Sequence, residues 1–191
     1  ARMVSAEEVA EAKKAYPDAA VVTYVNSTAE VKALSDICCT SANAMRVVNS
    51  LPHNRILFIP DRNLGQNIAR MIPKEFLYLE GYCHVHESLK EQEILRVKEL
   101  IPEAEIILHP EVNPLVARHA HKLLSTGGML KYASMLSGKK MIIGTEMGLL
   151  YRLQKLAPQN QYYNVGRDLV CPNMKKIRME HVIDALRNEA N

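Results

Sequence analysis

The sequence has 191 residues, which is enough for one large domain or two small ones. Apolar residues make up 48% and charged residues 24%, which excludes a disordered, collagen-like or low-complexity chain. The formal net charge is only +3, with two Phe and no Trp, so the composition argues against nucleic acid or an anionic membrane as a partner.

The first predicted element is an amphipathic helix beginning after Ser5. Ser5 and Glu8 have the spacing of a capping box, in which each side chain accepts a hydrogen bond from the backbone of the other residue. The helix starts almost at the first residue, and no Met opens the chain. We therefore expect residues 1–17 to form a helix that links from a missing first domain.

Residues 16–65 and 101–150 repeat one another without a gap, 85 positions apart. Each copy predicts a first strand (20–23 and 105–108), two helical patterns around a second short strand, and a third strand (55–59 and 140–144) followed by a helix. This alternation predicts an α/β fold. We expect two similar three-layer αβα domains with short parallel sheets, over residues 18–101 and 102–191, the second ending in a C-terminal helix.

Polar residues follow the strands in both copies, where the ligands of parallel sheets bind. In a single loop such residues would be read as ordinary turn and cap residues, but their recurrence favours a ligand site. They include Tyr24, Asn26, Ser41 and Asp61 in the first copy and His109, Glu111, Ser125, Thr126 and Glu146 in the second.

The four cysteines are too few and too dispersed for a disulfide framework, and no apolar run reaches the ~18 residues that a membrane span needs. We therefore expect a reduced, cytoplasmic protein.

Cys83 and Cys171 each come shortly before a predicted helix, at similar places in the two repeats. The helix after Ser5 matches the one predicted to open at Ser88, which places a third cysteine just upstream of Ala1. The chain is then the second and third of three repeats, and three thiolates suit an iron-sulfur cluster, zinc or copper(I).

Several segments in this order resemble the quinolinate synthase family. They include Tyr24-Val25-Asn26, Cys39-Thr40-Ser41-Ala42-Asn43, Pro60-Asp61-Arg62-Asn63-Leu64-Gly65, Gly81-Tyr82-Cys83-His84-Val85-His86, His109-Pro110-Glu111, Ser125-Thr126-Gly127-Gly128 and Cys171-Pro172-Asn173. The resemblance spans nearly the whole chain. It implies the last two of three αβα domains related by pseudo-threefold symmetry.

The resemblance also implies an activity. Such a transferase condenses iminoaspartate with dihydroxyacetone phosphate to form quinolinate, with loss of phosphate and water, in de novo NAD biosynthesis. An aspartate-oxidising enzyme, L-aspartate oxidase, supplies iminoaspartate. The implied cofactor is a 4Fe-4S cluster held by three cysteines, whose open iron acts as a Lewis acid. Without its first domain, the fragment is expected to be inactive.

Residue by residue, the resemblance makes Cys83 and Cys171 two of the three cluster ligands. Glu111 matches the general base and Tyr24 a phenol donor, while the residues matching substrate-binding positions are Tyr24, Asn26, Ser41, His86, His109, Glu111, Ser125 and Thr126. Cys38 and Cys39 fall on Leu123 and Leu124 of the repeat and are assigned to the core.

Two alternatives remain open from the residues themselves. A non-catalytic module could bind zinc through Cys83, His84, His86 and Cys171, or bind a small anion. The chain could also be an inert fragment of the enzyme.

Overall fold

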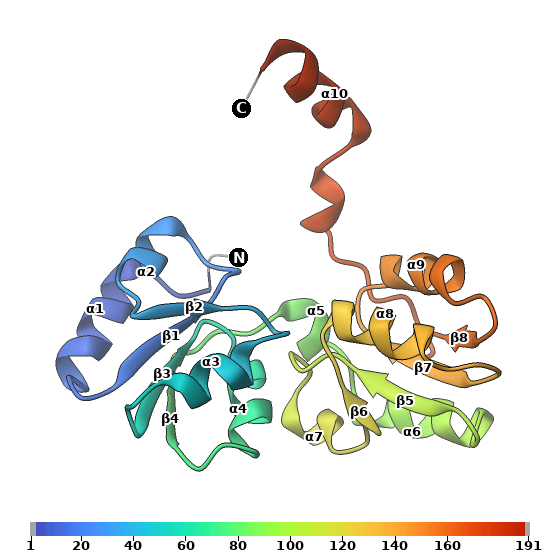
Figure 1. Ribbon diagram of the computed structural model, residues 1–191, viewed down its shortest axis with the longest axis horizontal. Helices are drawn as coiled ribbons and strands as arrows, with labels where there is room; N and C mark the ends of the chain where they lie inside the picture. The colour runs from blue at the N-terminus through green and yellow to red at the C-terminus, as the bar shows by residue number, and fades with distance from the viewer. Residues whose placement is uncertain (1–2, 190–191) are drawn as a thin grey trace.

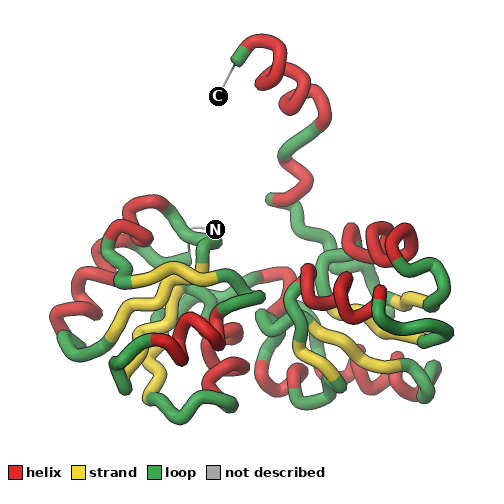
Figure 2. Tube along the Cα trace, in the orientation of Figure 1, coloured by secondary structure: helices red, strands yellow, loops and turns green. Residues whose placement is uncertain are grey.

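The computed structural model describes residues 3–189 and contains two four-stranded, all-parallel sheets. Residues 1–2 and 190–191, at the outer ends of the predicted first and last segments, lie outside the described residues. The first sheet has the order β2-β1-β3-β4 and the second the order β6-β5-β7-β8. Figure 2 shows the two sheets side by side, each enclosed by helices. The predicted α/β fold with short parallel sheets is confirmed.

The strands of the two sheets correspond one to one. In the first sheet they are β1 (Ala20–Tyr24), β2 (Ile37–Cys39), β3 (Arg55–Ile59) and β4 (Glu75–Tyr78). In the second they are β5 (Glu105–Leu108), β6 (Lys122–Leu123), β7 (Lys140–Gly144) and β8 (Gln161–Tyr163). The strands β3 and β7 have the bounds predicted from the repeat.

The helices also recur in the same order. The first group is α1 (Ala6–Ala15), α2 (Ala29–Ala33), α3 (Ala44–Ser50) and α4 (Arg62–Ala69). After the short α5 (His84–Glu87), the second group is α6 (Glu91–Leu100), α7 (Pro114–Ala117), α8 (Thr126–Ser134) and α9 (Gly148–Leu156). A 3₁₀ turn η1 (Met174–Lys176) and α10 (Met179–Asn188) complete the described chain.

Each sheet is buried on both faces because its central strands are apolar at most positions. In β1, Val21 points toward α1 and α2, whereas Val22 points toward α3 and α4. In β5, Ile106 packs with α6 and α7, and Ile107 packs with α8 and α9. Two such layers around each sheet give the three-layer αβα arrangement.

The helix before each sheet packs against the sheet that follows it. In α1, Val9 and Ala12 lie in the core of the first sheet, and in α6, Ile94 and Val97 lie in the core of the second. Packing therefore groups α6 with the second sheet, although the predicted boundaries place it at the end of residues 18–101. Those boundaries stay a prediction, since packing and sequence repeat divide the chain at different points.

The ends of three helices test the sequence patterns directly. The capping box of Ser5 and Glu8 forms as predicted, and Ser125 caps α8 by accepting from the Gly128 N–H at 3.1 Å. Ser88, however, does not open the helix after Cys83. That helix, α6, begins at Glu91, and the Ser88 hydroxyl instead donates to the Val85 carbonyl inside α5.

The segment after β8 leaves the second sheet and ends in α10, which projects away from both sheets in Figure 1. Every described residue of α10 is exposed, including Val182, Ile183 and Leu186. Among residues 3–189, no helix combines the length and the apolar character needed to cross a bilayer.

Two glycines provide a stability test. A Cβ atom at Gly81 would overlap the Pro60 carbonyl oxygen, whereas one at Gly127, in the first turn of α8, would meet open space. We expect Gly81→Ala to lower the free energy of unfolding by roughly 1–3 kcal/mol, because backbone must shift. Gly127→Ala should leave it unchanged or raise it by up to about 1 kcal/mol. Urea unfolding of both variants measures this, and equal stability would contradict the close approach.

Candidate active site

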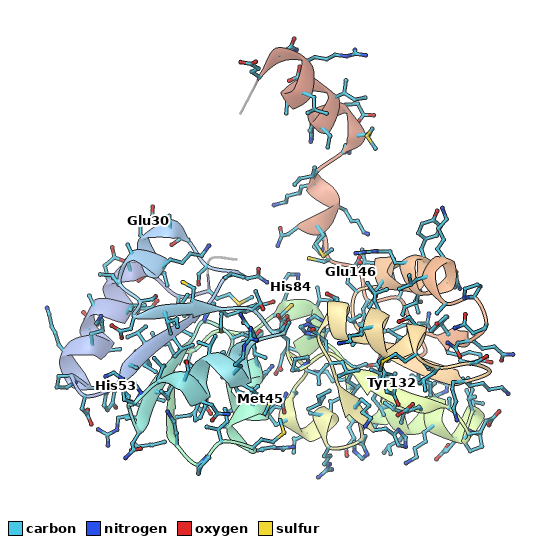
Figure 3. All side chains as sticks on the ribbon, in the orientation of Figure 1. Glu30, Met45, His53, His84, Tyr132 and Glu146 are labelled. Atoms are coloured by element: carbon cyan, nitrogen blue, oxygen red, sulfur yellow. The ribbon has the colours of Figure 1, made fainter. Side chains whose placement is uncertain are left out.

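One cavity of about 910 Å³ gathers most of the predicted functional residues. Its walls come from loops at the carboxyl ends of both sheets, from α5 and from the segment after Cys171. Figure 3 labels His84 on α5, between the two sheets, and Glu146 beside the second sheet. The predicted residues that line it are Tyr24, Asn26, Ser41, Cys83, His86, His109, Glu111, Thr126 and Cys171.

Ser125 is the predicted site residue that does not line the cavity. Its hydroxyl oxygen is used as the cap of α8, while Thr126, the next residue, faces the cavity. Ser41 does line the cavity but does not cap α3. Asn43 is the residue before that helix, and its side-chain oxygen accepts from the Thr40 N–H instead.

The centre of the cavity is a buried contact between His86 and Glu111. The His86 Nδ1 lies 2.9 Å from a Glu111 carboxylate oxygen and 3.2 Å from the Cys83 sulfur. On the other side of the ring, Nε2 lies 3.0 Å from the Thr145 hydroxyl. His86 on α5 therefore contacts one thiol, one carboxylate and the residue that follows β7.

These contacts set the charges of the pair. Burial by itself would lower the pKa of His86, but its hydrogen bonds to Cys83 and Glu111 raise it to about 10. Burial by itself would raise the pKa of Glu111, but the hydrogen bond from His86 and the neighbouring imidazoles lower it to about 2. The pair is thus an imidazolium and a carboxylate, the arrangement that a buried charge needs.

His109 stacks against His86 and is neutral. The ring centroids are 4.6 Å apart with an interplanar angle of 21°, and burial together with the charge of His86 lowers the pKa of His109 to about 4. Its Nδ1 accepts from the Glu111 backbone N–H at 3.4 Å. The remaining proton of His109 must therefore be on Nε2, where it can be donated.

Tyr24 stays a phenol. Burial, followed by the charge of Glu111, raises the pKa of Tyr24 above its ordinary value. The side chain comes from the last residue of β1 and is 8% exposed. It is therefore a proton donor in this cavity and not a base.

Asp61 lines the cavity. The repeat placed it among the polar residues after the strands, but gave it no role in the site. Its two carboxylate oxygens accept from the Leu64 N–H at 2.8 Å and from the Cys83 N–H at 2.9 Å. It therefore caps α4 and fixes the backbone of Cys83 at once. Burial and the charge of Glu111 raise the pKa of Asp61 to about 7.

Sequence reasoning also missed Thr145, Arg152 and Lys175. Thr145 directly follows β7 in the repeat, and its place at a strand end is the signal that could have identified it. Lys175 forms an ion pair with Glu146 at 3.0 Å, joining the segment after Cys171 to the second sheet. No sequence signal marks Arg152, because it lies inside an ordinary amphipathic helix, α9.

The donor set suits a metal centre in two ways. Cys83, His86 and Glu111 place one ligand atom each within 4.8 Å of one another. Cys83 and Cys171 are both free, half-buried thiols that line the cavity. Two soft sulfur donors in one cavity fit an iron-sulfur cluster, and the cysteine, histidine and carboxylate fit a single ion such as zinc. Cys39 is buried in β2 as assigned, but the assignment of Cys38 to the core is wrong, because its side chain lies on the exposed side of the same strand. Neither cysteine lines the cavity.

Similar proteins from several organisms are all quinolinate synthases. The chain is 49% identical over 187 residues to the quinolinate synthase of Geotalea uraniireducens and 48% identical over 190 residues to that of Geobacter metallireducens. The quinolinate synthase of Methanoregula boonei is 47% identical over 186 residues. These alignments cover 97 to 100% of this chain but 62% of each relative, so the chain spans less than two thirds of their length.

A family model agrees with these relatives. The model described as Quinolinate synthetase A protein matches residues 1–191, which include both sheets and every cavity residue named above. The chain belongs to the quinolinate synthetase A family.

Proposed function

We propose that this chain forms two of the three repeats of an enzyme that condenses iminoaspartate with dihydroxyacetone phosphate to quinolinate. The reaction releases phosphate and two waters and needs no oxidant, because the atoms of the two substrates equal those of the products. The observation that carries the proposal is that Cys83, Cys171, Glu111, Tyr24 and both buried histidines line one cavity. Membership of the family supplies the reaction.

Cys83 and Cys171 would hold a 4Fe-4S cluster, with a third cysteine from outside this chain. When bound, the cluster supplies an iron that acts as a Lewis acid on a substrate oxygen. The two thiols meet its chemistry, since both are free and both face the cavity. Asp61 assists by fixing the main chain of Cys83.

Glu111 is the proposed general base. Its carboxylate is ionised and lies in the cavity, so it can accept a proton from a substrate carbon or nitrogen. The hydrogen bond from His86 weakens it as a base. A substrate oxygen could accept the hydrogen bond from His86 Nδ1 in place of Glu111. The Glu111 carboxylate would then be free and more basic when it accepts the substrate proton.

Tyr24 and His109 are the proposed donors. The Tyr24 phenol holds its proton, and His109 carries one on Nε2, so both can assist departing hydroxyl groups during the dehydrations. Asn26, Ser41 and Thr126 contribute polar groups to the same cavity. The free backbone N–H groups that begin α8 favour the carboxylates and the phosphate of the substrates.

We also propose, from the soluble pathway implied by the family, a cytoplasmic enzyme supplied with iminoaspartate by L-aspartate oxidase. The other candidate is a zinc-binding module with no catalytic role. The close grouping of Cys83, His86 and Glu111 donors favours it, because these three residue types bind zinc.

Metal content separates the two candidates. We expect anaerobically purified protein that contains the upstream segment to carry about four iron and four acid-labile sulfide per chain. Residues 1–191 alone should carry less, because one cysteine ligand is missing. Iron, sulfide and zinc are measured in both preparations. Zinc in place of iron in the longer protein would refute the cluster.

Changing Cys83 to Ser should remove the cluster and its visible absorption, because the hydroxyl of serine is a poor ligand for iron in this setting. Cys38→Ser is the matched control, since the Cys38 side chain is exposed and outside the cavity. Visible spectra of the two longer proteins are compared. An unchanged spectrum for Cys83→Ser would remove Cys83 from the ligand set.

Changing Glu111 to Gln should reduce quinolinate formation by about 10² or more while leaving iron and sulfide content unchanged. Glutamine keeps the shape of the side chain but cannot accept a proton at neutral pH. Glu99→Gln, on an exposed position of α6, is the control for the loss of one charge. Turnover by Glu111→Gln at the control rate would exclude Glu111 as the base.

A further inference from the structure

The loop that carries Glu111 is held by side-chain amides from the other half of the molecule. Asn67 Nδ2 donates to the Pro110 carbonyl and to the Val112 carbonyl, each at 2.8 Å. Asn63 Nδ2 donates to the carbonyl of Glu111 itself at 3.2 Å. Three consecutive main-chain carbonyls are thus bonded by two asparagines. We call Asn63 and Asn67 the amide clamp.

The amide clamp is rigid because of its place in the fold. Its two residues are four apart on α4, so their side chains lie on one face of the helix. Both side chains are 1% exposed, which shields their hydrogen bonds from competition by water. The helix α4 follows β3 of the first sheet, whereas residues 110–112 follow β5 of the second.

The clamp also reaches the helix that carries His86. Asn63 Nδ2 lies 2.7 Å from a Glu87 carboxylate oxygen, and Asn113 Nδ2 lies 3.3 and 3.4 Å from the two oxygens of Glu87. Glu87 is the neighbour of His86 on α5. The network therefore ties together the two backbones that bring His86 and Glu111 to 2.9 Å from one another.

The choice of an amide is informative at position 67. Its Oδ1 is buried and has no hydrogen-bond partner among residues 3–189. A buried amide oxygen without a partner is unfavourable, so packing by itself would favour an apolar side chain. The Nδ2 group of Asn67, which donates to two carbonyls, is therefore the group that explains an amide at this position.

We propose that Asn63 and Asn67 are positioning residues, which act through Glu111 and do not touch substrate. By fixing the carbonyls on both sides of Glu111, they fix the direction of its side chain toward His86 and the cavity. This inference rests on the role proposed above for Glu111 as the base. An error of about 1 Å in the position of a catalytic group can lower the rate by about 10².

The test uses the longer, cluster-containing protein and Asn67→Asp. Aspartate has the shape of asparagine but, when ionised, donates to neither carbonyl. We expect kcat to fall roughly ten- to hundredfold with little change in KM, and iron content and visible spectrum to stay the same. Asn49→Asp, at an exposed position of α3, is the matched control. If Asn67→Asp does not fold, Asn67→Ala removes the donors without adding a charge.

Two further measurements separate positioning from a merely structural role. Hydrogen exchange of the backbone amides in residues 108–116 should become faster in the Asn67 variant and stay unchanged in the control. In a Glu111→Gln background, the Asn67 change should lower kcat by less than about twofold, because it acts through the missing carboxylate. Normal kcat, additive losses or unchanged exchange would each overturn the proposal.

The same experiments distinguish failure of the clamp from failure of the proposed function. Full turnover by Glu111→Gln would refute the role of Glu111 as the base, and with it the catalytic meaning of the clamp. The exchange of residues 108–116 would still decide whether Asn67 holds the loop.

Discussion

The functional cavity depends on one constraint, which is that every strand in each sheet runs parallel to its neighbours. Parallel pairing places all carboxyl ends of a sheet at one edge. The loops after β1 and β3 therefore begin side by side, and so do the loops after β5 and β7. Two such edges meet around α5. Side chains as distant in sequence as Tyr24 and Cys171 therefore line the same cavity. Without the parallel arrangement, alternate loops would leave at opposite edges and the cavity would lose half of its walls.

Burial gives these side chains their chemical states. Asp61, His86, His109 and Glu111 are each less than 10% exposed, so their charges are set by one another and not by water. One imidazolium and one carboxylate form a pair, while the second imidazole stays neutral because its neighbour is already charged. A cavity that holds donors, an acceptor and two thiols together fits the proton transfers and the metal centre proposed above.

The two halves are joined by polar contacts at the loop that carries Glu111, the residue whose position the proposed function depends on. Apolar packing encloses each sheet in its helices, but the hydrophobic effect is not directional. The amides of Asn63 and Asn67 add directional hydrogen bonds, which fix the loop of residues 110–112 at three points. These hydrogen bonds run from α4 of the first half to the loop after β5 of the second, so they join the two halves.

Local patterns and the internal repeat determined much of this protein. Alternating strand and helix predicted two parallel sheets, and β3 and β7 have the predicted bounds because short apolar runs between turns are local signals. The repeat also placed Tyr24, His109 and Glu111 at strand ends, where the cavity lies. The start of α6 at Glu91 and the roles of Asp61, Thr145 and Asn67 were decided only by the tertiary structure. Each depends on a partner that is distant in sequence or on competition between neighbouring caps. A side-chain amide on a helix has the same local signature whether it faces water or the carbonyls of another unit.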